Sequence, residues 1–280
     1  MEPRTLTIGH SPDADDAFMF YALTHGCLDT GPLRFRHELQ DIETLNRRCL
    51  AGELDVSAVS LHAYAYLADR YLLLSSGCSM GDGYGPIVVT HQAMTRQELL
   101  QATIAIPGTL TTAYLVLRLW LGHPFRFTVL PFDQILDAVA EGQTAAGLLI
   151  HEGQLTYAQR GLHCAVDLGA WWQTQTGLPL PLGGNIVRKD LGPDLVQLVD
   201  RYVRASVEYA LGHRAEALQY ALRFARGLGA DQADRFVAMY VNQWTQDYGA
   251  RGREAVRRLL AAGYQAGVLP QLVEPQFACS

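Results

Sequence analysis

The stretch of residues 144–157, TAAGLLIHEGQLTY, constrains the fold more than any other part of the sequence. Its apolar run from Ala145 to Ile150 is too short for a free-standing helix and is typical of a strand that is buried on both faces. Strands of that kind occur in parallel sheets covered by helices, so we predict an α/β protein. His151 and Glu152 end the run abruptly, at the kind of sheet edge where open α/β proteins bind ligands.

His151 is the candidate catalytic residue. An imidazole at the end of a strand is placed to act as a general base toward a ligand at that edge. The alternative is a histidine that only closes the strand by bonding a backbone carbonyl. Because successive residues of a strand point to opposite faces, Glu152 is expected to face away from His151 and to be structural.

Three other segments share one order, in which a short apolar strand is followed by polar residues and then by a helical pattern. The polar junctions are residues 11–16 (SPDADD), Ser60 and residues 108–112 (GTLTT). Such helix starts bind anions, because their first N–H groups lack internal partners and the helix dipole is positive there. If the junctions converge, they predict a small-molecule substrate that carries a carboxylate or several oxygen atoms. Taken singly, each hydroxyl is better explained as a helix cap, and it is their coincidence that favours a binding site.

Three acids, Asp13, Asp15 and Asp16, mark the first junction. They suit the helix dipole but would repel a carboxylate ligand. No further acid or histidine stands at metal-ligand spacing, so we predict no metal site. At least one of the three is expected to accept hydrogen bonds from substrate hydroxyls, and we include Ser11 and Asp16 among the substrate-binding residues.

The composition argues against several classes of function. A chain of 280 residues with 49% hydrophobic residues can form two compact lobes. Its net charge of −6 argues against a nucleic-acid surface, and no apolar window is long enough to cross a bilayer. Five widely spaced cysteines without a C-x-x-C pair predict free thiols. We therefore expect a cytoplasmic protein with no nucleic-acid or membrane partner.

With these residues in view, the chain resembles the menaquinone-biosynthesis family of two-lobed proteins shaped like periplasmic binding proteins, and within it the lyase branch of the futalosine pathway. The motifs that carry the resemblance extend over most of the chain. They are residues 11–16, 41–46 (DIETLN), 108–114 (GTLTTAY), 150–152 (IHE), 166–172 (VDLGAWW), 177–183 (GLPLPLG) and 240–242 (YVN).

The resemblance implies a type II periplasmic-binding-protein-like fold with a ligand cleft between its lobes. It further implies a lyase that converts cyclic dehypoxanthinyl futalosine to 1,4-dihydroxy-6-naphthoate without a cofactor, with His151 as proton acceptor. Ser60, Thr112 and Ala113 match positions where the family holds its substrate. Their neighbours Ala58, Val59 and Thr111 complete the predicted substrate site.

Residues 1–90 and 185–280 are expected to form the larger lobe and residues 91–184 the smaller one. A homodimer is a reasonable expectation for such a chain. Two other functions stay open. The first is a non-catalytic or divergent two-lobed protein that binds a small carboxylate, because a fold does not by itself imply chemistry. The second is a dehydratase of the same family that acts on chorismate.

Overall fold

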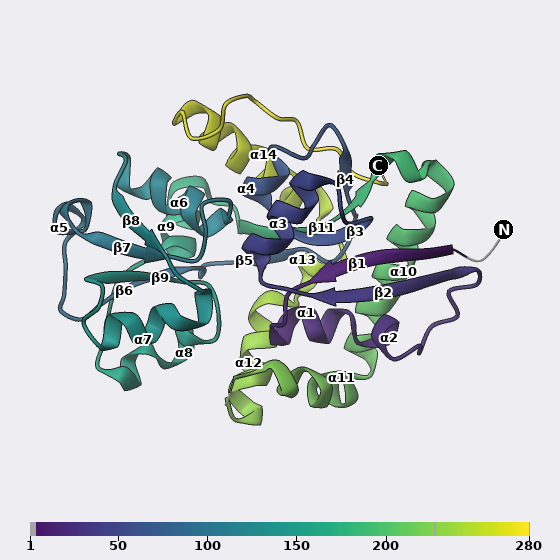
Figure 1. The fold of residues 1–280 in the computed structure, drawn as a ribbon, viewed down its shortest axis with the longest axis horizontal. Coiled ribbons are helices and arrows are strands. Elements are labelled where there is room, and N and C mark those ends of the chain that lie inside the picture. The colour runs from purple at the N-terminus through teal and green to yellow at the C-terminus, as the bar shows by residue number, and fades with distance from the viewer. Residues whose placement is uncertain (1–3, 227, 280) are drawn as a thin grey trace.

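The computed structural model describes residues 4–226 and 228–279, which form two β-sheets flanked by helices (Figure 1). The strands of the first sheet are β1 (Arg4–His10), β2 (Leu33–Leu39), β3 (Val56–Ser60), β4 (Tyr71–Leu73), β5 (Ser79–Gly81) and β11 (Leu180–Arg188). The strands of the second sheet are β6 (Ile87–Thr90), β7 (Thr103–Ile106), β8 (Arg126–Val129), β9 (Ala146–Leu149) and β10 (His163–Asp167). Each sheet is the centre of one lobe.

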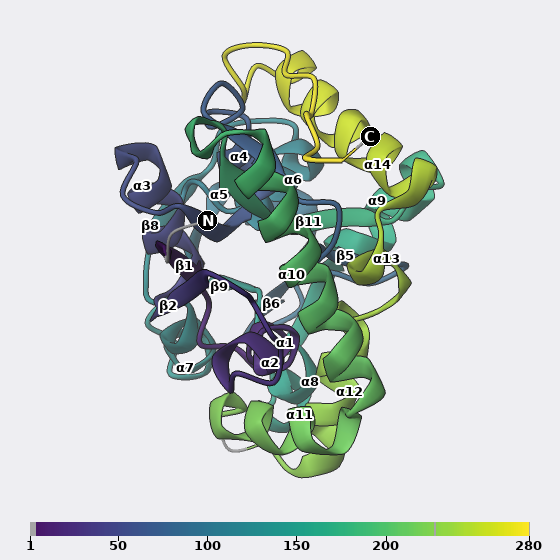
Figure 2. The same cartoon turned by 90° about the vertical axis from the view of Figure 1, so that its right-hand side faces the viewer.

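The helices divide between the lobes in the same way. Those of the larger lobe are α1 (Ala14–Met19), α2 (Tyr21–Thr24), α3 (Ile42–Ala51), α4 (Leu61–Tyr64), α10 (Pro193–Gly212), α11 (Arg214–Ala221), α12 (Ala230–Tyr240), α13 (Gln243–Gln246) and α14 (Gly249–Gln265). Those of the smaller lobe are α5 (Arg96–Gln101), α6 (Thr112–Leu121), α7 (Ile135–Ala140), α8 (Gly153–Thr156) and α9 (Leu168–Thr176). Short 3-10 turns are η1 (Phe132–Gln134), η2 (Tyr157–Arg160), η3 (Lys189–Leu191) and η4 (Leu222–Phe224). Figure 2 shows α10 descending in front of the first sheet toward α11 and α12.

Parallel pairing brings the polar junctions to common sheet edges. The first sheet has the order β2-β1-β3-β11-β4, and β1 pairs in parallel with β2 and β3. The second has the order β10-β6-β9-β7-β8, and β7 pairs in parallel with β8 and β9. All four residues of β9 are buried, which confirms the predicted strand. The residues that follow β1 and β3 therefore emerge at one edge, as do those that follow β7 and β9.

The sheets divide the chain a few residues before the predicted boundaries. We expected β6 in the larger lobe, but it pairs with β9 and β10 of the second sheet. We expected residues 180–184 in the smaller lobe, but they begin β11 of the first sheet, where Leu180 pairs with Gly81 of β5. The chain crosses between lobes at residues 82–86 and 177–179. A Cβ on Gly169 would lie 1.9 Å from the Tyr84 carbonyl oxygen, so a crossing segment rests directly on the start of α9.

An apolar core joins the lobes on one side. Leu61 of α4, Leu115 of α6 and Leu259 of α14 are fully buried in one cluster that continues to Leu148 of β9. Burying each of these side chains contributes about 1.5–3 kcal/mol. The lobes are thus packed together behind the cleft, while separate clusters fill the rest of each lobe. Within the part of the chain that is described, no helix has the length and apolarity needed to span a membrane.

Candidate active site

A cavity with about 770 Å³ of empty space, its mouth included, lies between the two sheets. Both lobes contribute to it. Its lining includes Ser11, Asp16, Ala58, Val59, Ser60, Thr111, Thr112 and Ala113, which are the eight predicted substrate-binding residues. Ile150, Gln154, Leu182, Phe236 and Tyr240 also line it. The cavity therefore offers both apolar walls for a ring and polar groups for substituents.

The start of α6 lies at this cavity, because Thr111, Thr112 and Ala113 are among its lining residues. The Thr111 hydroxyl caps the helix by accepting from the Tyr114 N–H at 3.2 Å, so the capping interpretation holds for this residue. The Thr112 hydroxyl donates to the Leu182 carbonyl at 2.5 Å and accepts from the His62 N–H at 3.2 Å. Both hydroxyls thus form hydrogen bonds to protein groups. What the helix start offers an anion is the N–H groups of its first turn and the positive end of its dipole.

Ser60 stands at the N-cap position of α4, but its hydroxyl makes no capping bond. Instead the Asn46 side chain holds Ser60 twice, accepting from its N–H at 2.9 Å and donating to its Oγ at 3.2 Å. Asn46 belongs to the motif at residues 41–46, in which Asp41 caps α3. Glu43 of the same motif reaches the smaller lobe, where it accepts from the Leu110 N–H at 3.0 Å. The motif therefore orients Ser60 and ties the loop before α6 to α3.

Carboxylates dominate the opposite helix start. Asp13, Asp15 and Asp16 all line the cavity, and Asp16 accepts a 2.6 Å hydrogen bond from the Ser11 N–H. Burial raises the pKa of Asp16 to about 7, although that hydrogen bond opposes the rise. Burial and the neighbouring acids raise the pKa of Asp15 well above its usual range. Because a protonated acid does not repel a carboxylate ligand, these raised pKa values weaken the repulsion that the sequence predicted.

His151 is buried beside the cavity but is not part of its lining, whereas Ile150 and Gln154 are. Its ring lies over Gly153 and packs edge-on against Phe132 at 5.7 Å. Nδ1 accepts a 3.0 Å hydrogen bond from the Gly153 N–H, and the buried Nε2 has no partner among the described residues. An unpaired buried ring nitrogen is costly unless a ligand or a movement of the ring satisfies it.

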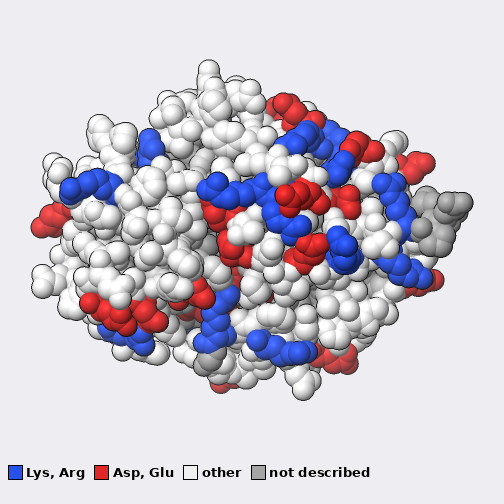
Figure 3. Space-filling model, viewed as in Figure 1, with Lys and Arg blue, Asp and Glu red and all other residues white. Residues whose placement is uncertain are grey.

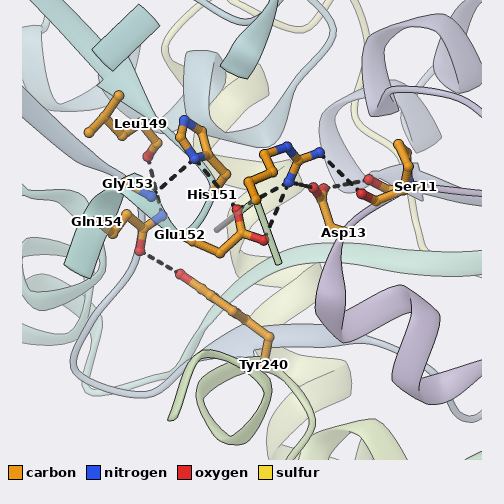
Figure 4. Close-up of polar contacts among 10 residues, drawn as sticks. Ser11, Asp13, Leu149, His151, Glu152, Gly153, Gln154 and Tyr240 are labelled. Atoms are coloured by element: carbon orange, nitrogen blue, oxygen red, sulfur yellow. Dashed lines mark hydrogen bonds and ion pairs between the residues drawn. The ribbon is translucent and has the colours of Figure 1, made fainter. Parts of the chain in front are cut away.

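The expectation that Glu152 faces away from His151 is wrong. Its Oε2 lies 3.6 Å from Nδ1 of His151 (Figure 4). The expectation assumed strand alternation, but β9 ends at Leu149 and residues 151–152 form a turn. Burial alone would raise the pKa of Glu152, but His151 and the Arg226 guanidinium more than offset it and lower that pKa.

Three side chains at the site were given no role by the sequence analysis. Gln154 accepts from the Tyr240 hydroxyl at 2.8 Å, which links the turn after β9 to the end of α12. Arg226 pairs with Asp13 and Glu152 at 2.6 and 3.1 Å. All three contacts join segments more than 70 residues apart, and only the three-dimensional fold brings them together. The 240–242 motif contains Tyr240, yet its spacing alone gave it no role.

The charged groups limit what the site can hold. The described residues that line the cavity include no Lys, Arg or His, so a bound carboxylate would rely on N–H groups and hydroxyls. Within the described ranges, no group of three or more His, Cys, Asp or Glu side chains is arranged to hold a metal ion. Figure 3 shows Lys and Arg in separate small groups on one face, with much of the smaller lobe uncharged.

Two lobes with a ligand cavity at the strand ends define the class of binding-protein-like α/β proteins. The chain superposes with a TM-score of 0.73 on the alkanesulfonate-binding protein of Xanthomonas axonopodis pv. citri, covering 98% of this chain and 97% of that one. At 16% identity this likeness concerns the fold alone, and it confirms the predicted periplasmic-binding-protein-like architecture.

The chain belongs to the menaquinone biosynthesis family, whose model matches residues 6–265. It is 43% identical to a 1,4-dihydroxy-6-naphthoate synthase of Thermus thermophilus, over 97% of this chain and 98% of the relative. It is 39% identical to a synthase of the same name in Streptomyces coelicolor, over 97% of each chain. The resemblance that the sequence motifs indicated is confirmed at the level of the family.

Proposed function

We propose that this chain is a carbon–carbon lyase of the futalosine pathway that converts cyclic dehypoxanthinyl futalosine to 1,4-dihydroxy-6-naphthoate. The name of the two relatives supports this product, and the substrate is the one that the family resemblance implies. The observation that carries the proposal is that all eight residues predicted to bind the substrate line one cavity of suitable size and mixed polarity. That they bind substrate remains a prediction.

The cavity suggests how the substrate is held. Its carboxylate binds at the start of α6, where Thr112 and Ala113 direct their backbone N–H groups, with the Ser60 hydroxyl beside it. Ile42, Ile150 and Phe236 provide apolar surface for the ring system. On the other side the acids before α1 bond substrate hydroxyls, and Asp16 can donate as well as accept because its pKa is raised to about 7.

His151 acts as the general base once its ring turns toward the cavity. Closure of the lobes excludes water, and Nε2 takes a proton from a substrate hydroxyl. The electron pair of that O–H bond forms a carbonyl group as the adjacent carbon–carbon bond breaks. The pair from the broken bond enters the ring that becomes aromatic, so the step needs no redox cofactor. Nε2 has no partner among the described residues, and it can accept the proton once the proton of the neutral ring is on Nδ1.

The test is to incubate the purified protein with cyclic dehypoxanthinyl futalosine and to detect the naphthoate by mass spectrometry. We expect product from the wild type and none from His151→Ala. His91→Ala is the matched control, because His91 is exposed on the smaller lobe, and it should retain full activity. Turnover by His151→Ala at the wild-type rate would refute the assigned base.

The position of His151 outside the cavity lining favours one second candidate, a two-lobed protein that binds a small carboxylate without converting it. The same samples distinguish the two. If the wild type forms no product while 1,4-dihydroxy-6-naphthoate or chorismate raises its melting temperature, the binding function replaces the lyase. The free thiols support a cytoplasmic location for either function.

A further inference from the structure

Arg226 connects the two lobes through Asp13, which lines the cavity, and through Glu152. It lies between η4 and α12 in the larger lobe, where Nη1 donates to Asp13 at 2.6 Å and Nη2 donates to the Pro12 carbonyl at 3.1 Å. The same Nη1 reaches across to the smaller lobe and donates to both Glu152 oxygens, at 3.3 and 3.1 Å. The guanidinium also lies over the Phe132 ring, 4.6 Å from its centroid. Arg226 thus makes polar contacts with both lobes and an aromatic contact with the smaller lobe.

These contacts differ from an ordinary surface ion pair. The side chain of Glu152 is only 3% exposed, and those of Asp13 and Arg226 are 19% and 28% exposed. Exposed pairs contribute little to stability, but removing one partner of a buried pair leaves a charge without compensation. Arg226 also has a φ of 45°, the only positive φ of a non-glycine residue in the described chain. That backbone conformation is unfavourable for arginine and persists because surrounding contacts fix it.

Glu152 connects this contact to His151. The imidazole Nδ1 has two neighbours, the Gly153 N–H at 3.0 Å and the Glu152 carboxylate at 3.6 Å. When Nδ1 accepts from Gly153, the neutral ring carries its proton on Nε2 and cannot take another there. When Nδ1 donates to Glu152, Nε2 is unprotonated and can act as a base. The position of the Glu152 carboxylate therefore selects the tautomer, and Arg226 holds that carboxylate.

We propose that Arg226 is a positioning residue that latches the smaller lobe onto the larger one and holds Glu152 where it can set the tautomer of His151. The kinetic part of this inference rests on the proposed lyase function, whereas the latch itself does not. A second contact acts in the same place, because Tyr240 at the far end of α12 donates to Gln154. The turn at residues 151–154 is thus held by Arg226, which precedes α12, and by Tyr240 at the C-terminal end of α12.

The latch can be measured without any ligand. Cys27 of the larger lobe and Cys164 of the smaller lobe are exposed and accept spin labels, while Cys49 and Cys78 are buried, and Cys279 is replaced by Ser in every sample. Pulsed electron spin resonance then reports the distance between the lobes. We expect one narrow distribution for the labelled parent and a broader, longer one for Arg226→Gln. An unchanged distribution in Arg226→Gln would overturn the latch.

Arg214→Gln is the matched control. Arg214 also combines an ion pair, to Asp234 at 2.6 Å, with an aromatic contact, 5.4 Å from the Phe18 centroid. All of these residues lie within the larger lobe, so the control removes the same chemistry without touching the cleft. It should leave the distance between the lobes unchanged. A shift as large in Arg214→Gln as in Arg226→Gln would show general loosening of the helices and contradict the latch.

The positioning role is read from kinetics with cyclic dehypoxanthinyl futalosine. We expect Arg226→Gln to lower kcat about a hundredfold, because a misplaced base loses its alignment, and to raise KM by less than about tenfold, because the α6 subsite is intact. Glu152→Gln should behave similarly, and the double variant should lose no more than either single one. Additive losses, or a change in KM alone, would overturn the positioning role.

Two safeguards keep the outcomes separate. If Arg226→Gln does not fold, Arg226→Lys and Asp13→Asn replace it, since each keeps part of the network. If the wild type has no lyase activity, the proposed function fails, yet the distance measurement still confirms or refutes the latch.

Discussion

The starts of α1 and α6 face the same cavity and follow the same order of strand, polar junction and helix, yet they have opposite electrostatic characters. Before α1 the junction carries Asp13, Asp15 and Asp16, and the Ser11 N–H already donates to Asp16. Before α6 there are only hydroxyls, and these bond to protein groups rather than to the N–H groups of Thr112 and Ala113. One helix start is surrounded by acidic side chains, whereas the other has no acid in its first turn.

The difference teaches that the order of residues at a strand–helix junction does not by itself define an anion site. The side chains around the helix start decide whether its N–H groups remain available. In this cavity the two starts take complementary roles, with α6 for the carboxylate and α1 for hydroxyl groups. The predictions below test that division, from the largest expected effect to the smallest.

Asp16→Asn tests the acidic side through the pH dependence of stability. The folded-state pKa of about 7 exceeds the ordinary value of 3.8, so between these pH values folding retains a proton that unfolding releases. The stability from this group is complete below pH 4 and is lost as pH rises through 7. From pH 5 to pH 8 the wild type should lose about 3 kcal/mol more than Asp16→Asn in urea unfolding.

Only the difference between the two proteins is informative in that experiment. Burial lowers the pKa of His10 to about 3 and of His37 to about 4, which makes stability rise with pH over part of the same range. Those groups are present in both proteins and cancel. If the difference does not depend on pH, Asp16 is ionised throughout, and the start of α1 repels a carboxylate as the sequence alone predicted.

Ala113→Asp would make the start of α6 resemble that of α1. An acid there compensates the helix dipole and repels a carboxylate, so we expect the affinity for 1,4-dihydroxy-6-naphthoate to fall about a hundredfold. Isothermal titration calorimetry measures this. Ala113→Asn has nearly the same shape without the charge and should lose much less. Equal losses in both variants would mean that space, not charge, limits binding at α6.

Gly108→Ala tests how the loop before α6 is fixed. A Cβ at Gly108 would lie 2.3 Å from Glu43 Oε2, which accepts from the Leu110 N–H. Displacing Glu43 should cost about 2 kcal/mol in the free energy of unfolding. Gly212→Ala is the control, because nothing lies near its added methyl group. If both variants unfold at the same urea concentration, Glu43 is not held as the structure indicates.

Thr111→Ala should have the smallest effect. It removes the hydroxyl that accepts from the Tyr114 N–H, which costs about 1 kcal/mol of stability. Thr111→Ser keeps the cap and should be nearly neutral in thermal unfolding. Because the hydroxyl is engaged in capping, ligand affinity should change little in either variant. A large loss of affinity in Thr111→Ala alone would assign this hydroxyl to the ligand.

The sequence was sufficient to predict the strands and helix starts that follow from the local order of apolar and polar residues. The buried strand β9 and the polar junctions at Ser60 and Thr112 follow from apolar runs and helix starts, and parallel pairing explains why they meet. The lobe boundary was displaced because β6 pairs antiparallel with β9, and a short apolar strand does not reveal its partners. The family resemblance extended over the whole chain and supplied the fold.

Contacts made by single long-range side chains could not be predicted in this way. Arg226 lies in a turn without periodicity, 213 residues from its partner Asp13. Glu152 was misjudged because strand alternation stops at Leu149. The orientation of the His151 ring likewise depends on Gly153 and Phe132, which no spacing rule connects to it.

A crystal structure with 1,4-dihydroxy-6-naphthoate bound would test the central claim most directly. We expect the carboxylate within hydrogen-bonding distance of the Thr112 and Ala113 N–H groups, and the ring hydroxyls toward Asp15 and Asp16. The His151 ring should be turned so that Nε2 faces the cavity. A carboxylate bound at the start of α1, or a ligand outside the cavity with His151 still packed on Phe132, would contradict the account.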